Sequence, residues 1–248
     1  MRNNPRLIAG LLLFTAVCVV GIWIALDDSV PALDRAVTDA VVSHRIPLLT
    51  SITSAVTLAC SPVAVSAWTM LAAVLLLLRD RTVHRALPLV ATVAVAGVVG
   101  EILKITVHRH RPPATVQLGP HEAAFSYPSG HVLGTTAFVL TLLLVTTAGS
   151  GRAVRGAARF VAPVIVTVAA FTRLYLGAHW LTDVAAAIAL GIAASLIVPV
   201  WATALEPVIA QHSPPLLRPY LSTDAGSQAA PQRSPLSCSA RFDERPQP

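Results

Sequence analysis

Long apolar runs, separated by short segments that hold most of the charged residues, set the pattern of this chain. A helix needs roughly 17 to 25 apolar residues to cross a bilayer's hydrocarbon core. Six runs of about this length predict membrane-spanning helices, and we expect them to form one domain over residues 1–210. They lie at Leu7 to Leu26, Pro62 to Leu78, Ala86 to Val107, Val132 to Ala148, Ala157 to Leu176 and Val184 to Leu205. The predicted fold is therefore an all-α integral membrane bundle of six transmembrane helices.

The first run also resembles a secretory signal peptide, because Arg2 and Arg6 precede it. Its apolar part is longer than the roughly 7 to 15 residues of a signal core, and no small-residue cleavage pattern follows it. We therefore expect this run to be a transmembrane helix.

Two segments lack the pattern of a span. Residues 211–248 are rich in Pro, Ser and Gln and contain seven prolines, so we expect a disordered cytoplasmic tail that cannot bury enough surface to fold. The segment from Asp27 to Ser61 carries four aspartates among valines, which predicts an amphipathic stretch on the outer membrane surface. No chemistry is apparent in that stretch.

Composition supports the membrane assignment. Of the 248 residues, 54% are hydrophobic and only 12% are charged, whereas soluble domains average about 25% charged residues. The formal net charge of +6 does not indicate nucleic-acid binding, because the basic residues are spread over the loops between spans. The three cysteines, Cys18, Cys60 and Cys238, are scattered and predict neither a disulfide framework nor a metal site.

The distribution of arginine predicts the orientation. If the N-terminus is inside, the next two inner loops both carry arginine triplets, in agreement with the positive-inside rule. These residues are Arg79, Arg81, Arg85, Arg152, Arg155 and Arg159. We therefore expect a multi-pass plasma-membrane protein with both termini in the cytoplasm. Four aromatic residues near predicted span ends, Trp23, Tyr175, Trp180 and Trp201, are expected to anchor the spans at the interface.

Three polar clusters interrupt the apolar pattern. One closes the third span (Lys104 to Pro112), one opens the fourth (Tyr127 to His131), and one joins the fifth to the sixth (Arg173 to Asp183). The end of an odd span and the start of the next even span lie on the same membrane face. All three clusters should therefore meet on the outer side. Polar and charged groups at membrane depth are costly, so their convergence predicts a functional site for an anion.

The third cluster contains a candidate nucleophile. His179 and Asp183 are four residues apart, which places both on one face of a helix. The carboxylate can then accept the Nδ1 proton and leave Nε2 free to attack. The alternative is a solvated loop histidine beside an incidental helix acid, and the other two clusters argue against it.

The other clusters supply candidate anion ligands. Lys104 offers a point charge and Arg111 a guanidinium fork, although snorkelling to the interface is an alternative for Lys104. Glu101, three residues earlier, is expected to pair with Lys104. Ser129 and Gly130 precede the fourth span, where the free N–H groups of a helix start can bind an anion. An ordinary capped helix start is the alternative.

Three histidines between the third and fourth spans, His108, His110 and His121, raise the question of a metal site. Only Glu122 offers a carboxylate nearby, which favours a solvated loop. We predict neither a metal nor another cofactor.

The three clusters together resemble a known family. The spacings Lys104-x6-Arg111-Pro112, Pro128-Ser129-Gly130-His131 and Arg173-x5-His179-x3-Asp183 are similar to the signature motifs of the type 2 phosphatidic acid phosphatases, which are related to vanadium haloperoxidases. The matching region runs from Lys104 to Asp183. Thr172 stands where the family usually has serine, so a hydroxyl is retained.

The resemblance implies a metal-independent lipid phosphate phosphatase that forms a phosphohistidine. Transferred by position, His179 would be the nucleophile, Asp183 its orienting partner and His131 the acid for the leaving group. The residues implied to bind the phosphoryl oxygens are Lys104, Arg111, Ser129, Gly130 and Arg173.

A protein that binds or transports a lipid phosphate without hydrolysis is the alternative function. Such a protein needs the cations but has no use for a histidine beside a carboxylate, so His179 and Asp183 favour an enzyme. The substrate stays open among phosphatidic acid, phosphatidylglycerol phosphate and polyprenyl diphosphate, and the oligomeric state is open as well.

Overall fold

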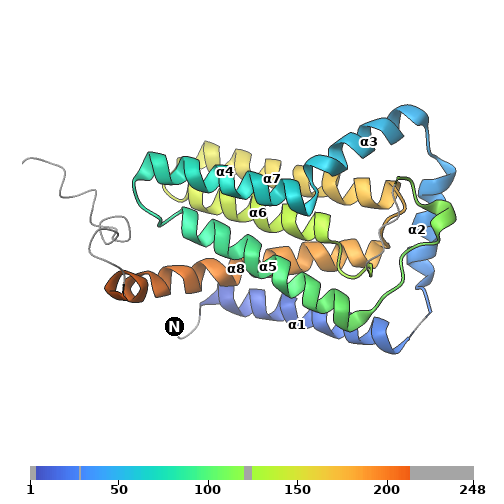
Figure 1. Ribbon diagram of the computed structural model, residues 1–248, viewed down its shortest axis with the longest axis horizontal. Coiled ribbons are helices and arrows are strands. Elements are labelled where there is room, and N and C mark those ends of the chain that lie inside the picture. Colours follow the sequence, from blue (N-terminus) through green and yellow to red (C-terminus); the bar gives the residue numbers. More distant parts are fainter. Residues whose placement is uncertain (1–3, 28, 120–124, 213–248) are drawn as a thin grey trace, which may run out of the picture.

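Six long helices make up most of the protein. The computed structural model describes residues 4–27, 29–119 and 125–212, and no strand occurs in these ranges. The spans are α1 (Pro5–Leu26), α4 (Pro62–Asp80), α5 (Ala86–Val107), α6 (Gly130–Thr147), α7 (Arg152–Tyr175) and α8 (Leu181–His212). All six are long and apolar enough to cross a membrane. They run side by side along one direction (Figure 1), which confirms the predicted six-span bundle.

Two helix boundaries differ from the prediction by more than three residues. α7 begins at Arg152 rather than Ala157, and α8 continues to His212, past the predicted start of the tail at residue 211. Hydropathy marks where the chain leaves the apolar layer, whereas a helix can continue into the polar region. The remaining part of the predicted tail, residues 213–248, lies outside the described residues.

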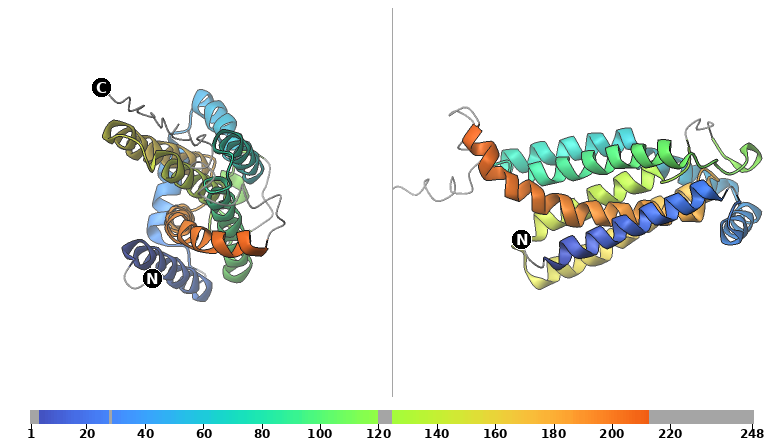
Figure 2. Two further views of the ribbon diagram at one scale, coloured as in Figure 1. Left: turned by 90° about the vertical axis from the view of Figure 1, so that its left-hand side faces the viewer. Right: turned by 90° about the horizontal axis from the view of Figure 1, so that it is seen from below.

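α8 is the central helix of the bundle and packs against α1, α5 and α6 (Figures 1 and 2). Glycines allow this close approach. A Cβ at Gly191 of α8 would lie 2.6 Å from the Cβ of Thr136 in α6, and a Cβ at Gly10 of α1 would lie 2.6 Å from Cγ1 of Ile197. Small residues at helix contacts are typical of membrane bundles. The packing fixes the start of α8 beside the start of α6.

The segment between the first two spans forms a cap. It contains α2 (Ala32–Ser43) and α3 (Pro47–Ala59), and α2 lies across the end of the bundle in Figure 1. A short 3-10 turn, η1 (Ala114–Val116), lies in the α5–α6 connection. Arg45 donates from Nε and Nη2 to the carbonyl of Tyr175, at 2.9 and 2.7 Å. The Tyr175 hydroxyl in turn accepts from the backbone N–H of Ile46 at 2.9 Å. The cap is thus fastened to the end of α7.

The predicted role of two aromatic residues is wrong. Tyr175 and Trp180 are 2% and 5% exposed, so neither serves as an interfacial anchor. The polar edge of each ring has a partner inside the protein, and for Trp180 the indole Nε1 donates to the carbonyl of His110 at 2.9 Å. Trp23 and Trp201 keep about half of their surface exposed on the bundle, as an anchor requires.

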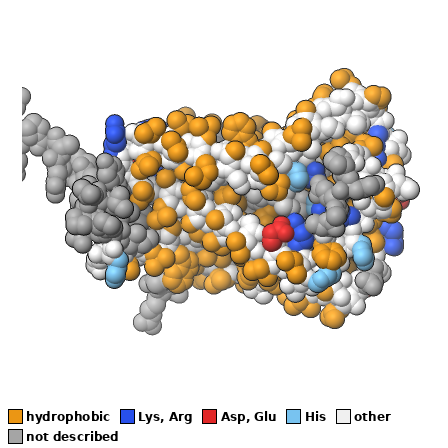
Figure 3. Space-filling model, in the orientation of Figure 1, with side chains coloured by type: hydrophobic (Ala, Val, Ile, Leu, Met, Phe, Trp, Pro, Cys, Tyr) orange, Lys and Arg blue, Asp and Glu red, His pale blue; other side chains and the backbone are white. Residues whose placement is uncertain are grey.

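The surface divides into two regions. Hydrophobic side chains cover the length of the bundle in Figure 3, and basic and histidine side chains appear at its two ends, most of them at the end where α2 lies. This division, together with the six spans, identifies a multi-pass membrane protein.

Candidate active site

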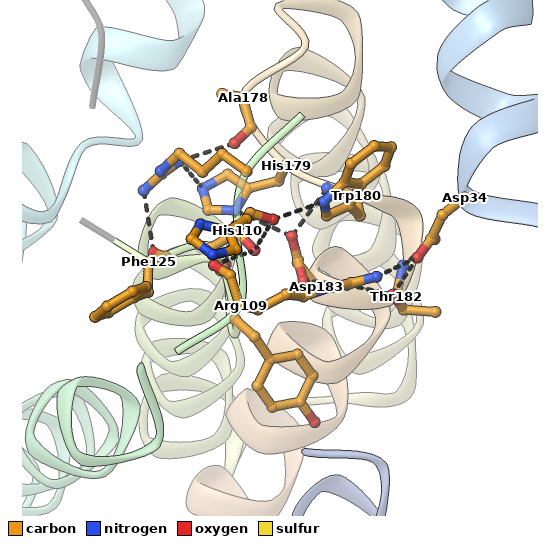
Figure 4. Close-up of polar contacts among 12 residues, drawn as sticks. Asp34, Arg109, His110, Phe125, Ala178, His179, Trp180, Thr182 and Asp183 are labelled. Atoms are coloured by element: carbon orange, nitrogen blue, oxygen red, sulfur yellow. Dashed lines mark hydrogen bonds and ion pairs between the residues drawn. The ribbon is translucent and has the colours of Figure 1, made fainter. Parts of the chain in front are cut away.

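The three polar clusters meet at the capped end of the bundle (Figure 4). Arg111, beyond the end of α5, lies with Nη1 3.1 Å from Nε2 of His179 in the α7–α8 connection. The backbone N–H of Ser129, ahead of α6, donates to the carbonyl of Asp183 in α8 at 3.3 Å. The alternation of spans explains why segments far apart in the sequence share this end.

His179 is held in one tautomer. Its Nδ1 lies 2.9 Å from the carbonyl oxygen of Ser126, which can only accept, so Nδ1 carries the proton. Arg111 can only donate, so its contact places a lone pair on Nε2. Burial lowers the pKa of His179 to about 4, against the opposing charge of Asp183. The positive charges of Arg111 and Arg173 act in the same direction as burial. At neutral pH the imidazole is therefore uncharged, with Nε2 in the nucleophilic form.

Asp183 is placed differently from the sequence prediction. Its Oδ2 lies 3.6 Å from Nδ1 of His179, beyond the roughly 3.2 Å of a good hydrogen bond. Oδ2 instead accepts from the backbone N–H of Trp180 at 2.9 Å, and Oδ1 lies 2.5 Å from Nη1 of Arg109. The backbone carbonyl of Ser126 thus accepts the hydrogen bond from Nδ1 of His179. Asp183 acts on His179 through its charge and by holding the turn that carries the imidazole.

Arg109 and Asp34 are site residues that the sequence analysis missed. Arg109 bridges two carboxylates, with Nη2 2.6 Å from Oδ2 of Asp34 and Nη1 2.5 Å from Oδ1 of Asp183. Thr182 joins them, because its backbone N–H donates to Asp34 at 2.9 Å and its hydroxyl donates to Asp34 at 2.6 Å. Both carboxylates are fully buried. The network connects α2, the segment after α5 and the start of α8 (Figure 4).

A signal for Asp34 was present in the sequence. Asp34 stands at helical spacing from Val37, Thr38 and Val41, on the less polar face of an amphipathic helix. A carboxylate on a buried face needs a partner, since burying an isolated charge is very costly. The identity of that partner, 75 residues along the chain, could not be read from the pattern.

The other candidate phosphate ligands come from α5, the start of α6 and the end of α7. Nζ of Lys104 lies 2.8 Å from Oε1 of Glu101, which confirms the expected pair. The same Nζ lies 3.7 Å from the position that a Cβ of Gly130 would occupy. Arg173, 3% exposed, donates from Nη1 to the hydroxyl of Thr57 in α3 at 2.9 Å. His131 follows Gly130 in the first turn of α6.

Ser129 has an unusual hydroxyl. It occupies the N-cap position of α6, yet its side chain makes no capping hydrogen bond. Its Oγ is buried and has no hydrogen-bond partner among the described residues. Buried polar atoms of this kind are rare. At the start of a long helix and close to cations, the hydroxyl suits an oxygen of a bound anion.

Two histidines of the α5–α6 connection, His108 and His110, are described by the structure. In the described ranges, no group of three or more His, Cys, Asp and Glu side chains is arranged to hold an ion. His108 packs edge-on against Phe125, with ring centroids 4.4 Å apart, and His110 contributes its carbonyl to Trp180. His121 lies outside the described residues.

Comparison with known families agrees with the resemblance seen in the motifs. Residues 85–206 match the PAP2 superfamily, and this part of the chain contains every residue predicted for the site. The match confirms the resemblance to this family.

Individual relatives share sequence or fold. An undecaprenyl-diphosphatase of Sulfolobus acidocaldarius is 35% identical over 121 residues, covering 47% of this chain and 55% of the relative, so the match spans about half its length. A PAP2 type phosphatidylglycerolphosphate phosphatase from Bacillus subtilis is similar in structure, with a TM-score of 0.67, 21% identity and coverage of 77% of this chain and 96% of that one. LpxE of Aquifex aeolicus has a TM-score of 0.53, 20% identity and coverage of 67% and 94%. The two structures show a shared fold.

The Arg109 network leads to a test of stability. Asp34→Asn keeps the shape of the side chain and removes one of the two charges that Arg109 bridges. Breaking a buried ion pair costs about 3–5 kcal/mol, and we expect about 3 kcal/mol because Asp183 still pairs with Arg109. Denaturant unfolding of the purified protein in detergent measures the loss. Asp39→Asn, on the exposed face of the same helix, is the control and should change stability by less than about 0.5 kcal/mol. Equal losses of stability in Asp34→Asn and Asp39→Asn would contradict the proposal that the Arg109 network stabilises the fold.

Proposed function

We propose that this protein is a metal-independent phosphatase that removes a phosphate from a membrane lipid phosphate or diphosphate. The observation that carries the proposal is the Nε2 lone pair of a buried, neutral His179, held beside the Arg111 guanidinium. The match of residues 85–206 to the PAP2 superfamily supports it. The catalytic unit is the six-span domain of residues 1–210.

In the first step, Nε2 of His179 attacks phosphorus. A P–N bond forms while the bond to the lipid-side oxygen breaks, and His131 gives its proton to that oxygen. The Nδ1 proton of His179 stays directed at the carbonyl of Ser126. Asp183 stabilises the positive charge that develops on the ring. Phosphoryl transfer depends mainly on positioning and on neutralising the equatorial oxygens, which is the role of the ligands Lys104, Arg111, Ser129, Gly130 and Arg173.

The second step releases phosphate. His131, now neutral, takes a proton from water as the water oxygen attacks phosphorus and the P–N bond breaks. Inorganic phosphate leaves, and His179 returns to its neutral form. Arg111 is well placed for both steps because the fork that donates to Nε2 can donate to a phosphoryl oxygen beside it.

A groove beside Lys104 supports a lipid substrate. A cavity of about 200 Å³ lies among α4, α5 and α6, with Lys104 and Gly130 in its wall. Gly97, Val93 and Val65 continue the wall along the spans, so a hydrocarbon chain can lie there while its phosphate meets the cations. The sequence relative is an undecaprenyl-diphosphatase, and we therefore place polyprenyl diphosphate first among the substrates to assay.

The groove predicts that Gly97→Leu impairs the binding of long-chain lipid phosphates selectively. A Cβ at Gly97 meets nothing within 4 Å, so the side chain can enter the groove without a backbone clash. We expect KM for a long-chain lipid phosphate to rise about tenfold, the equivalent of two methylene contacts at about 0.8 kcal/mol each. Hydrolysis of a short, soluble phosphate ester should hardly change. Val98→Leu, one residue along and 61% exposed, is the matched control. A similar loss with both substrates would argue against a tail-binding groove.

The two histidines can be separated by trapping the intermediate. With a labelled aryl phosphate and a chelator present, His131→Ala should form the phosphoenzyme but hydrolyse it slowly, because an aryl leaving group needs little protonation. His179→Ala should form none. Quenching during turnover should yield acid-labile, base-stable label on His179.

His108→Ala removes an exposed histidine of the α5–α6 connection, and this variant should label and turn over like the unaltered protein. Label on another residue, or turnover by His179→Ala, would refute the assignment. Binding of the lipid phosphate with no label in any variant would favour the non-hydrolytic alternative.

We also propose that the protein lies in the plasma membrane with the site on the extracytoplasmic face and both termini in the cytoplasm. Two arginine triplets support this, one around the α4–α5 connection and one in the first turns of α7, since both lie at the end of the bundle opposite His179. Reporter fusions after Arg81 and after Gly119 should report the cytoplasm and the outside, respectively. Reports from the same side would exclude the topology.

A further inference from the structure

A second cavity lies at the opposite end of the bundle from His179. Its volume is about 570 Å³, within the usual range for small-molecule sites, and it lies among α6, α7 and α8. Part of its wall is apolar and comes from the spans, with Leu140, Leu144, Leu196 and Val200 as examples. None of the residues proposed for catalysis lines it.

Five basic residues also line the cavity. They come from α1, the two residues before α5, and α7: Arg6, His84, Arg85, Arg155 and Arg159. Arg155 and Arg159 are four residues apart and therefore share a face of α7, where like charges repel. Arg155 donates to the carbonyl of Ser150, and Arg85 lies 3.5 Å from Oδ2 of Asp80. No Asp or Glu is among the lining residues that the structure describes. The cavity is therefore complementary to an anion.

The position of the cavity indicates whether a soluble anion or an anionic lipid suits it better. α7 packs mainly on α6 and only lightly on α8, and the cavity lies along α7 and α8 within the membrane-spanning bundle. A soluble anion would pair with the arginines and leave the leucine-rich wall without a partner. A phospholipid satisfies both parts, with its phosphate at the arginines and an acyl chain along the wall.

We propose that this cavity binds an anionic phospholipid from the leaflet opposite the catalytic site. The cavity shares no lining residue with the groove beside Lys104. It is also separate from the catalytic site, because Asp183 and Leu196 stand 13 residues apart on α8, which is about 20 Å along a helix. The proposal does not depend on hydrolysis and adds a lipid ligand that is not a substrate.

Native mass spectrometry of the full chain in detergent tests the proposal. The probes are phosphatidylglycerol and phosphatidylcholine with identical acyl chains, with inorganic phosphate as the soluble competitor. The unaltered protein should retain phosphatidylglycerol in preference to phosphatidylcholine. Arg155→Gln/Arg159→Gln should weaken phosphatidylglycerol binding about thirtyfold, the effect expected for two cations near a lipid headgroup.

Two further variants make the outcome decisive. Arg155→Lys/Arg159→Lys keeps the charge and should retain most of the binding, which excludes misfolding as the cause of the loss. Arg79→Gln/Arg81→Gln removes the same charge at the same end of the bundle from exposed positions outside the cavity, and should bind like the unaltered protein. Equal loss in this control, or no loss in the Arg155→Gln/Arg159→Gln variant, would overturn the proposal. Displacement by millimolar inorganic phosphate would identify a soluble anion site instead.

Discussion

The site depends on one guanidinium that two buried carboxylates share. Arg109 lies between Asp34 and Asp183, and each of these three charged groups would be very costly to bury alone. Two acids on one cation leave an excess negative charge beside His179, where the positive charges of Arg111 and Arg173 also act. That excess offsets part of the repulsion between these two cations. The pairing also explains why α2 is fixed across the end of the bundle.

Burial and hydrogen bonding determine two different properties of the His179 side chain, its protonation state and its tautomer. Burial keeps the imidazole neutral, and the contacts to Ser126 and Arg111 decide which nitrogen carries the lone pair. Asp183 has a second task, because it receives the N–H of Trp180 and so shapes the turn that presents the ring. The Asp183 carboxylate therefore stabilises the backbone of the α7–α8 connection and also acts on the imidazole through its charge.

Much of this arrangement could be predicted from the sequence, because span length and alternation are local properties of the chain. Six apolar runs determine which clusters share a membrane face, and the four-residue spacing places His179 near Asp183. The partners of Asp34 and the acceptor at Ser126 could not be predicted, since these contacts depend on how distant segments fold against each other. The burial of Tyr175 and Trp180 could not be predicted either, because it depends on the cap and on the loop after α5.

The main-chain acceptor at Ser126 has a consequence for the evolution of this site. All twenty amino acids have a backbone carbonyl oxygen. No substitution of the Ser126 side chain can therefore remove the group that accepts the hydrogen bond from Nδ1 of His179. A carboxylate in that position would be lost through one codon change. The backbone conformation at Ser126 therefore determines the tautomer of His179. Substitutions that leave this conformation unchanged will also leave the tautomer unchanged.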